Sequence, residues 1–310
     1  MKAVRFHAYG GPEVLVYEDV PKPEPAAGEV LVKVHAASIN PIDWKVRAGH
    51  MKGFRDYPLP FILGWDVSGV VESCGAGVTQ WKPGDEVYGR PDMGRNGAYA
   101  EYIAVPEGEL ARKPSKLDHI HSAAIPLAGL TAWQALFDTA GLEAGQKVLI
   151  QAAAGGVGHF AVQFAKLKGL YVAGTASGRN QDYLKQLGCD LPINYETNPF
   201  EDGVHDFDAV IESMGGEVRK RSWKVLKRGG MMVCLIGPPP SEEDARAHGV
   251  RAAIIWGQMK ADQLAEIAGL ADSGKFRPEI AAVFPLREAA QAHKMSETEH
   301  VRGKLVLQVI

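Results

Sequence analysis

The chain has 310 residues, of which 46% are hydrophobic and 23% charged, and its formal net charge at pH 7 is −3. This composition is ordinary for a globular protein of one large or two medium domains, and without a basic surplus neither nucleic acid nor an acidic membrane is an expected partner. No apolar run reaches the length of a membrane span, the N-terminus turns polar too early for a signal peptide, and the three cysteines lie outside any CxxC motif, so we expect a reducing, cytoplasmic location.

Residues 1–118 predict a β-rich domain. Short apolar runs such as EVLVKVHAA (29–37) and GWDVSGVVES (64–73) alternate with segments that contain Gly and Pro. Runs of this length separated by turn residues are typical of antiparallel strands.

Residues 119–260 predict an α/β domain. Strands are expected at 147–153, 170–176, 191–195, 207–213 and 231–237, and helices at 156–169, 180–188 and 217–230. Strands that alternate with helices form a parallel, doubly wound sheet. Residues 261–310 return to a mixture of helix and strand.

The segment AAAGGVG (152–158) joins the first of these strands to the first helix. Its small residues are spaced as A-x-x-G-x-x-G, which permits a tight turn and brings backbone N–H groups close to a pyrophosphate. The alternative is a glycine-rich turn before an ordinary packed helix. Because the loop follows a strand and opens a helix, we expect it to bind a dinucleotide. The expected contacts are Ala154, Gly155, Gly156 and Val157.

The end of the second strand indicates which dinucleotide. An NAD site usually carries an acidic residue there, on the ribose 2′-hydroxyl. This chain has Ser177 and Arg179 instead, and no acid before Asp182. Both side chains could bind a 2′-phosphate, Arg179 through charge-assisted hydrogen bonds. We therefore expect NADPH; the alternative is a helix cap followed by a solvated arginine.

The whole chain resembles the zinc-independent medium-chain dehydrogenases/reductases of the quinone oxidoreductase (ζ-crystallin-like) group. The resemblance runs through GEVLVKVHAASINPIDWKVRAG, LGWDVSGVV, GAYAEYIAVP, AAIPLAGLTAWQAL and AAAGGVG to HVRGKLVL. It implies an α/β protein in which a GroES-like β-rich catalytic domain, residues 1–118 completed by 261–310, flanks a Rossmann NADP-binding domain, residues 119–260. Relatives also pair a late sheet edge across a two-fold axis, so the apolar run RAAIIWG (251–257) implies a homodimer.

Two departures concern metal. Zinc enzymes of this superfamily have a Cys ligand in C-x-x-D and a His ligand in G-H-E, whereas this chain has Asn40 and Trp65 in those positions. A zinc site of N and S ligands cannot be assembled from them, so no metal is expected. His119 and His121 are rival ligands, but no third ligand is near them in the sequence.

The resemblance implies further site residues. Asn40 could donate its amide N–H to a substrate oxygen, or merely cap a turn; Lys45 could balance a developing anion, or be solvated. The other implied residues are Trp65, Trp256 and Met259 in the substrate pocket, each with packing as the alternative, and Thr131, Tyr195, Ile236, Gly237 and Lys304 at the cofactor.

The missing zinc limits the chemistry. Without it, a simple alkoxide lacks its usual stabilising cation, whereas an electron-poor acceptor needs only a hydrogen-bond donor and a proton. We therefore expect NADPH-dependent reduction of a small electrophilic substrate, a quinone or an α,β-unsaturated carbonyl, by hydride transfer. A zinc-free carbonyl or alcohol dehydrogenase and a non-catalytic NADPH-binding protein remain alternatives.

Overall fold

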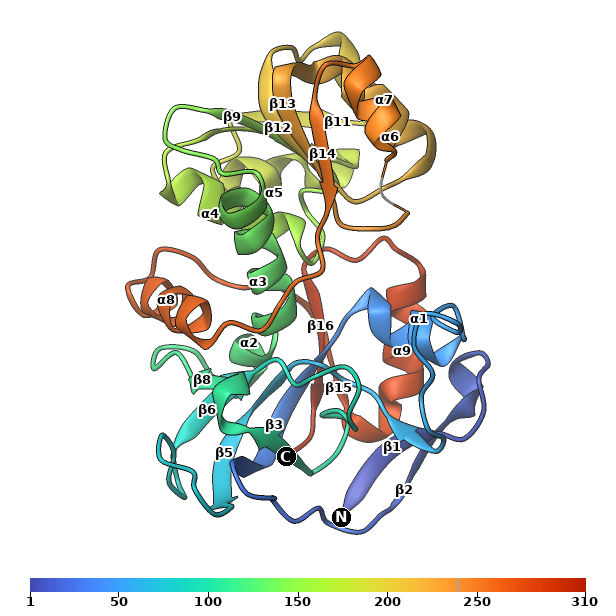
Figure 1. Ribbon diagram of the computed structural model, residues 1–310, viewed down its shortest axis with the longest axis vertical. Helices are drawn as coiled ribbons and strands as arrows, with labels where there is room; N and C mark the ends of the chain where they lie inside the picture. Colours follow the sequence, from blue (N-terminus) through green and yellow to red (C-terminus); the bar gives the residue numbers. More distant parts are fainter. Residues whose placement is uncertain (239) are drawn as a thin grey trace. The chain divides into compact units, whose positions relative to one another are not determined.

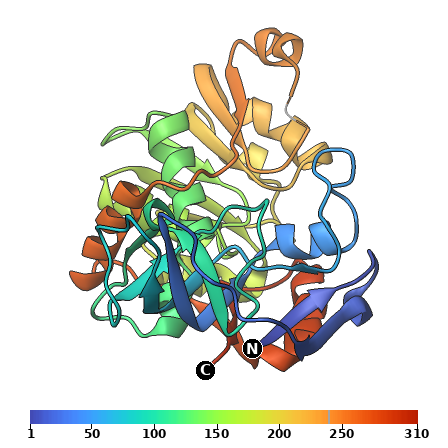
Figure 2. The ribbon, with the colours of Figure 1, turned by 60° about the horizontal axis from the view of Figure 1, so that its bottom comes forward.

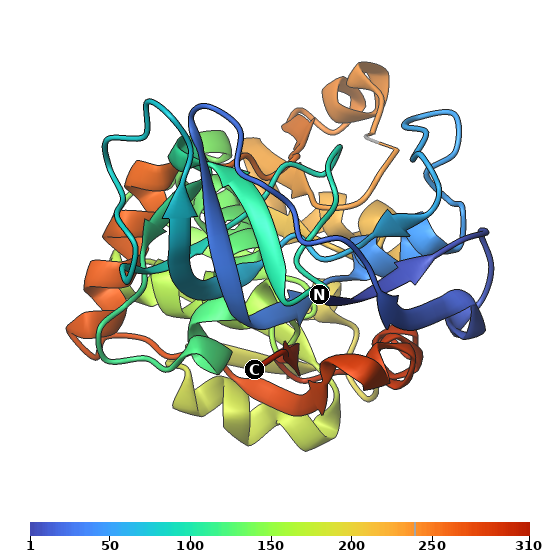
Figure 3. The same ribbon diagram turned by 90° about the horizontal axis from the view of Figure 1, so that it is seen from below.

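The computed structural model describes residues 1–238 and 240–310, which divide into two units. Unit 1 comprises Met1–Leu130 and Met259–Ile310, and unit 2 comprises Thr131–Gln258. Both chain ends lie in unit 1, as the N and C marks in Figures 2 and 3 show. The first border lies later in the chain than the predicted one at 118/119, and the second is close to the predicted one at 260/261.

Unit 1 is built on two sheets. The larger has the order β15-β16-β3-β5-β6-β8, with β7 also paired to β3, and the smaller has the order β2-β1-β4. Their strands are β1 (Lys2–Phe6), β2 (Leu15–Asp19), β3 (Glu29–Ile39), β4 (Phe61–Ile62), β5 (Val67–Cys74), β6 (Glu86–Gly89), β7 (Tyr102–Pro106), β8 (Leu110–Arg112), β15 (Ile280–Pro285) and β16 (Lys304–Gln308). The C-terminal strand β16 runs antiparallel to β3, with Leu305 opposite Ile39. This pairing places Lys304, at the start of β16, beside residues 39–40.

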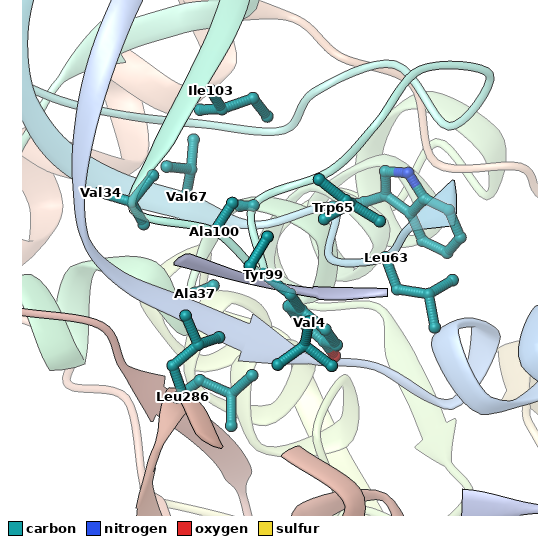
Figure 4. Close-up of a cluster of buried hydrophobic side chains, with 14 of the residues drawn as sticks. Val4, Val34, Ala37, Leu63, Trp65, Val67, Tyr99, Ala100, Ile103 and Leu286 are labelled. Carbon is teal, nitrogen blue, oxygen red and sulfur yellow. The ribbon is translucent and has the colours of Figure 1, made fainter. Parts of the chain in front are cut away.

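The core of unit 1 is apolar and lies between these strands and the late helix α9 (Ala289–Glu297) (Figure 4). Val4, Leu63, Tyr99 and Leu286 are at most 4% exposed, and Trp65 is fully buried among them. The helix α1 (Pro41–Arg47) lies beside α9 (Figure 1). The other helices that begin in this unit are α2 (His119–Ala123), α3 (Pro126–Trp133), whose last residues belong to unit 2, and α8 (Ala261–Asp272).

Unit 2 is a parallel sheet of six strands in the order β11-β10-β9-β12-β13-β14 (Figure 1). The strands are β9 (Lys147–Ile150), β10 (Tyr171–Ala176), β11 (Leu191–Asn194), β12 (Phe207–Glu212), β13 (Leu226–Cys234) and β14 (Arg251–Ile254). The helices are α4 (Gly158–Leu167), α5 (Gln181–Gln186), α6 (Gly216–Ser222) and α7 (Glu242–Ala247). The predicted doubly wound fold is confirmed, and the strand order reverses between β9 and β12, where such sheets bind ligands.

One predicted element is wrong at its end. The helix expected at 217–230 stops at Ser222, and Leu226 already belongs to β13, opposite Phe207. Val225 is fully buried in the core beneath the sheet, and Gly229 has a φ of +76°. The two glycines at 229–230 disfavour a helix, and sheet pairing decides the conformation of the segment.

Candidate functional site

The loop after β9 has the geometry of a pyrophosphate cradle. It leaves the sheet at the point where the strand order reverses and leads into α4 at Gly158. A Cβ atom at Gly158 would lie 2.2 Å from the carbonyl oxygen of Ala152, so only glycine fits there. Gly155, Gly156 and Val157 are partly exposed, whereas Ala154 is 5% exposed. The loop and the positive end of α4 therefore fit a dinucleotide phosphate.

The predicted 2′-phosphate residues lie at the ends of two neighbouring strands. Ala176 of β10 pairs with Asn194 of β11, so Ser177 and Tyr195 follow side by side. Arg179 is exposed, and Tyr195 is 50% exposed. These positions fit the adenosine end of a dinucleotide bound along the cradle.

The same place contains an acid that the sequence prediction missed. The Glu196 carboxylate accepts a hydrogen bond of 2.7 Å from the backbone N–H of Gly178, between Ser177 and Arg179. Glu196 comes directly after Tyr195, at the end of the third strand, whereas the acid of an NAD site is expected at the end of the second. The pairing of β10 with β11 is what brings this carboxylate to the turn.

An ion pair that the sequence analysis did not identify, Arg219 with Glu212, fixes the turn after β13. Arg219 donates to the Glu212 carboxylate at 2.6 Å and to the carbonyl oxygens of Ile236 at 2.7 Å and Pro238 at 2.5 Å. Glu212 is fully buried and also accepts the backbone N–H groups of residues 214 and 215. The pair thus holds the predicted cofactor residues Ile236 and Gly237 in one fixed turn.

Thr131 and the segment around Trp256 lie together within unit 2. A Cβ atom at Gly257 would be 2.6 Å from the Thr131 hydroxyl oxygen. The side chain of Gln134 exchanges two hydrogen bonds of 2.8 Å with the backbone of Gln258. Trp256 is 54% exposed, so its side chain is accessible. Met259 is partly exposed and belongs to unit 1.

In unit 1, Asn40 is part of a buried polar cluster with Asp66 and Lys304. The Asn40 amide donates to Asp66 Oδ2 at 2.7 Å and accepts at 2.5 Å from Lys304 Nζ, which also donates to the carbonyl of Ile39. Lys304 Nζ lies 3.6 Å from Asp66. Burial lowers the pKa of Lys304, an effect that the neighbouring carboxylates oppose. The predicted role of Lys304 as a cofactor contact stays a prediction, since its ammonium group faces protein partners.

Asp66 holds this cluster together. Its carboxylate also accepts from the hydroxyl of Ser38 and, at 2.6 Å, from the backbone N–H of Leu127. Asp66 is fully buried, and with these partners it fixes the plane of the Asn40 amide. One N–H of that amide is used; the second makes no hydrogen bond within the part of the chain that the structure describes.

A directional series of hydrogen bonds runs from Arg47 through His293 to Tyr99, and Asp43 lies buried in the same unit. Arg47 can only donate, so its contact of 3.2 Å makes His293 Nδ1 the acceptor and leaves the proton on Nε2, which donates to the Tyr99 hydroxyl at 3.3 Å. Asp43 accepts from the backbone of Asn40 and Gly64. Burial raises the pKa of Asp43 to about 7, and burial lowers the pKa of His293 to about 3.

Two predicted site residues of unit 1 remain, Lys45 and Trp65. Lys45 lies on α1 with its ammonium group 5.4 Å from the ring centre of Trp44. Trp65 is fully buried in the apolar core of unit 1, and its indole N–H has no hydrogen-bond partner in the described chain. Both roles stay predictions.

Zinc does not fit the positions of Asn40 and Trp65. The Asn40 amide is engaged by two protein groups, and the Lys304 ammonium group already balances Asp66. Among residues 1–238 and 240–310, no group of three or more His, Cys, Asp or Glu could hold a metal ion. The other two candidate ligands have different hydrogen-bond partners: His119 contacts the hydroxyl of Ser68, and His121 contacts the carboxylate of Asp118.

The fold and the cradle define a class of protein, one that has a β-rich domain and a parallel sheet with a dinucleotide-binding loop. A family model described as "Alcohol dehydrogenase GroES-like domain" matches residues 26–115, and one described as "Zinc-binding dehydrogenase" matches residues 187–307.

No helix in the described part of the chain is both long and apolar enough to cross a bilayer.

Similar proteins narrow the class. The chain is 37% identical to "NADPH-dependent alkenal/one oxidoreductase, chloroplastic" of Arabidopsis thaliana, over 99% of this chain and 79% of that protein. It is 34% identical to "NAD(P)H oxidoreductase RTN4IP1, mitochondrial" of Danio rerio, over 91% of this chain and 84% of that protein. The solved quinone oxidoreductase of Coxiella burnetii has a TM-score of 0.92 and 40% identity, covering 100% of this chain and 99% of that one. The chain belongs to the medium-chain dehydrogenase/reductase family, in its quinone oxidoreductase group.

Proposed function

We propose that this protein is an oxidoreductase that reduces quinones or α,β-unsaturated carbonyl compounds with NADPH and without a metal ion. The observation that carries the proposal is the buried cluster around Asn40, which holds one hydrogen-bond donor in a fixed orientation where zinc enzymes hold a ligand. The names of similar proteins, alkenal/one oxidoreductase and quinone oxidoreductase, support the substrate class.

The residues of unit 2 fit the cofactor. The loop Ala154–Gly156 and the start of α4 would hold the pyrophosphate, Ser177, Arg179 and Tyr195 the 2′-phosphate, and the turn at Ile236 the nicotinamide end. NADPH bound in this way supplies a hydride to the acceptor. The choice of NADPH over NADH is our proposal, supported by Arg179 and by the NADPH-dependent relative.

Asn40 is the group we propose to act on the acceptor. When an electron-poor acceptor gains negative charge on its oxygen, a preorganised N–H donor stabilises that charge. Lys304 donates to the amide oxygen of Asn40 and thereby draws electron density from its nitrogen, which strengthens the N–H as a donor. Asp66 fixes the amide, so little reorganisation is needed during the reaction.

The test combines a label with a substitution. With an enone and NADPH deuterated at the transferred position, deuterium should appear on the β-carbon of the product. Asn40→Ala should lower kcat about tenfold to a thousandfold, the usual cost of removing one oxyanion donor, with NADPH affinity unchanged. The exposed Asn198→Ala serves as the matched control and should keep full activity. Deuterium on a carbonyl carbon, giving an alcohol, would refute the proposed reaction.

A further inference from the structure

Arg90 comes out of the sheet next to the Asn40 cluster. Val67 of β5 pairs with Gly89 of β6 at the end of their antiparallel ladder. The next residue on each strand, Asp66 and Arg90, therefore leaves the ladder at the same end. Asp66 is the residue that fixes the Asn40 amide, so Arg90 lies within unit 1 close to the proposed donor.

The guanidinium group of Arg90 has no counter-ion in direct contact. Its Nε atom is buried without a hydrogen-bond partner, and its Nη2 atom contacts only the sulfur of Met93, at 3.7 Å. In the chain as described, no carboxylate lies within 4.0 Å of it. Burial lowers the pKa of Arg90, which the charges of Asp66, Asp92 and Glu109 oppose. A partly buried cation without a paired anion is unfavourable, so this arrangement needs an explanation.

The neighbouring carboxylates are already engaged. Asp66 is balanced by Lys304 at 3.6 Å and accepts hydrogen bonds from three protein groups. Asp92 accepts from the backbone of Gly94 and lies 3.6 Å from Arg55, and Glu109 accepts from the backbone of Asp92. In the described chain none of these carboxylates forms an ion pair with Arg90, so its guanidinium group can still contact an anion from outside the chain. Arg90 is also partly exposed, so such an anion can reach it.

We propose that Arg90 binds a carboxylate group of the acceptor, so that the protein prefers electron-poor substrates that carry an acid. This proposal rests on the proposed function and names its substrate class. Guanidinium and carboxylate match in geometry and form two parallel hydrogen bonds, and desolvation at a partly buried site strengthens them.

The experiment compares acetylacrylate with its methyl ester, of which only the first carries a negative charge, each reduced with NADPH. In the wild type, acetylacrylate should have the higher kcat/KM. Arg90→Gln should lower kcat/KM for acetylacrylate about tenfold to a hundredfold, the loss expected for a charge-assisted contact, and leave that for the ester within about twofold. For Arg90→Lys, kcat/KM for acetylacrylate should lie between the values of the wild type and Arg90→Gln. Arg95→Gln is the control, because Arg95 is on the same loop and partly exposed like Arg90 but is already paired with Glu29.

A binding measurement separates this proposal from the proposed function. Calorimetric titration of the NADPH-loaded protein with levulinate, a non-reacting analogue, should show binding that methyl levulinate lacks and that Arg90→Gln abolishes. If the protein reduces neither acceptor but binds levulinate through Arg90, the proposed function fails and the anion site stands. Equal loss for both acceptors in a folded Arg90→Gln variant, or a wild type that does not bind levulinate, would overturn the anion site. Inorganic phosphate that binds as well as levulinate would overturn the assignment to a carboxylate.

Discussion

Glu196 should weaken the binding of NADPH, and its replacement by Gln should strengthen it. The carboxylate lies 2.7 Å from the backbone nitrogen of Gly178, in the turn that we expect to receive the 2′-phosphate. For a phosphate bound by the same turn we assume a separation of about 5 Å between its charge and the carboxylate. Two unit charges at that distance in water interact by roughly 0.8 kcal/mol, and a phosphate carries about −1.5 to −2 charges. The repulsion is therefore about 1 kcal/mol after screening by salt.

The assay is a titration of protein fluorescence with each cofactor at low and high salt. Glu196→Gln should lower the Kd for NADPH about three- to tenfold and change the Kd for NADH less than twofold, because NADH has no 2′-phosphate. The gain should shrink in about 1 M salt, where the Debye length is about 3 Å. An unchanged or weaker affinity for NADPH in Glu196→Gln would refute the placement of the 2′-phosphate at this turn.

Four further outcomes are expected. Arg179→Ala should weaken NADPH binding about tenfold to a hundredfold and leave NADH binding nearly unchanged, and a wild type that prefers NADH in the same titration would contradict this. The purified protein should contain no stoichiometric zinc and keep its activity in chelators; about one zinc per chain by elemental analysis would disprove it. Light scattering should give a homodimer mass, since β14 is an edge strand; a monomer mass at micromolar concentration would exclude it. The pKa of His293 in the folded protein, about 3, is below its unfolded value, so its contribution to stability is present above about pH 6.5 and is lost as the pH falls. Between pH 7 and pH 5 the free energy of unfolding of the wild type should therefore decrease by about 2 kcal/mol more than that of His293→Gln, as measured by urea denaturation.

The sequence alone was sufficient for features that depend on neighbouring residues. The spacing of the glycines between 152 and 158 predicts the cradle because the turn is local and only a residue without a side chain fits at Gly158. The alternation of strands and helices predicts the parallel sheet for the same reason, since each strand is read from a few consecutive apolar residues. The helix expected at 217–230 fails past Ser222 because pairing with β12, which neighbouring residues do not encode, makes Leu226 part of a strand.

Only the tertiary structure decided which side chains meet. Asn40 bonds to Asp66, 26 residues away, and to Lys304, 264 residues away, because β16 pairs with β3. Glu196 reaches Gly178 through the pairing of β11 with β10, and Arg90 leaves the sheet beside Asp66 through the pairing of β6 with β5. Burial then sets the chemistry of these groups, because the cost of a charge depends on the partners and solvent around it. Neither the partners nor the burial can be obtained from spacing along the chain, since both follow from contacts between residues far apart in it.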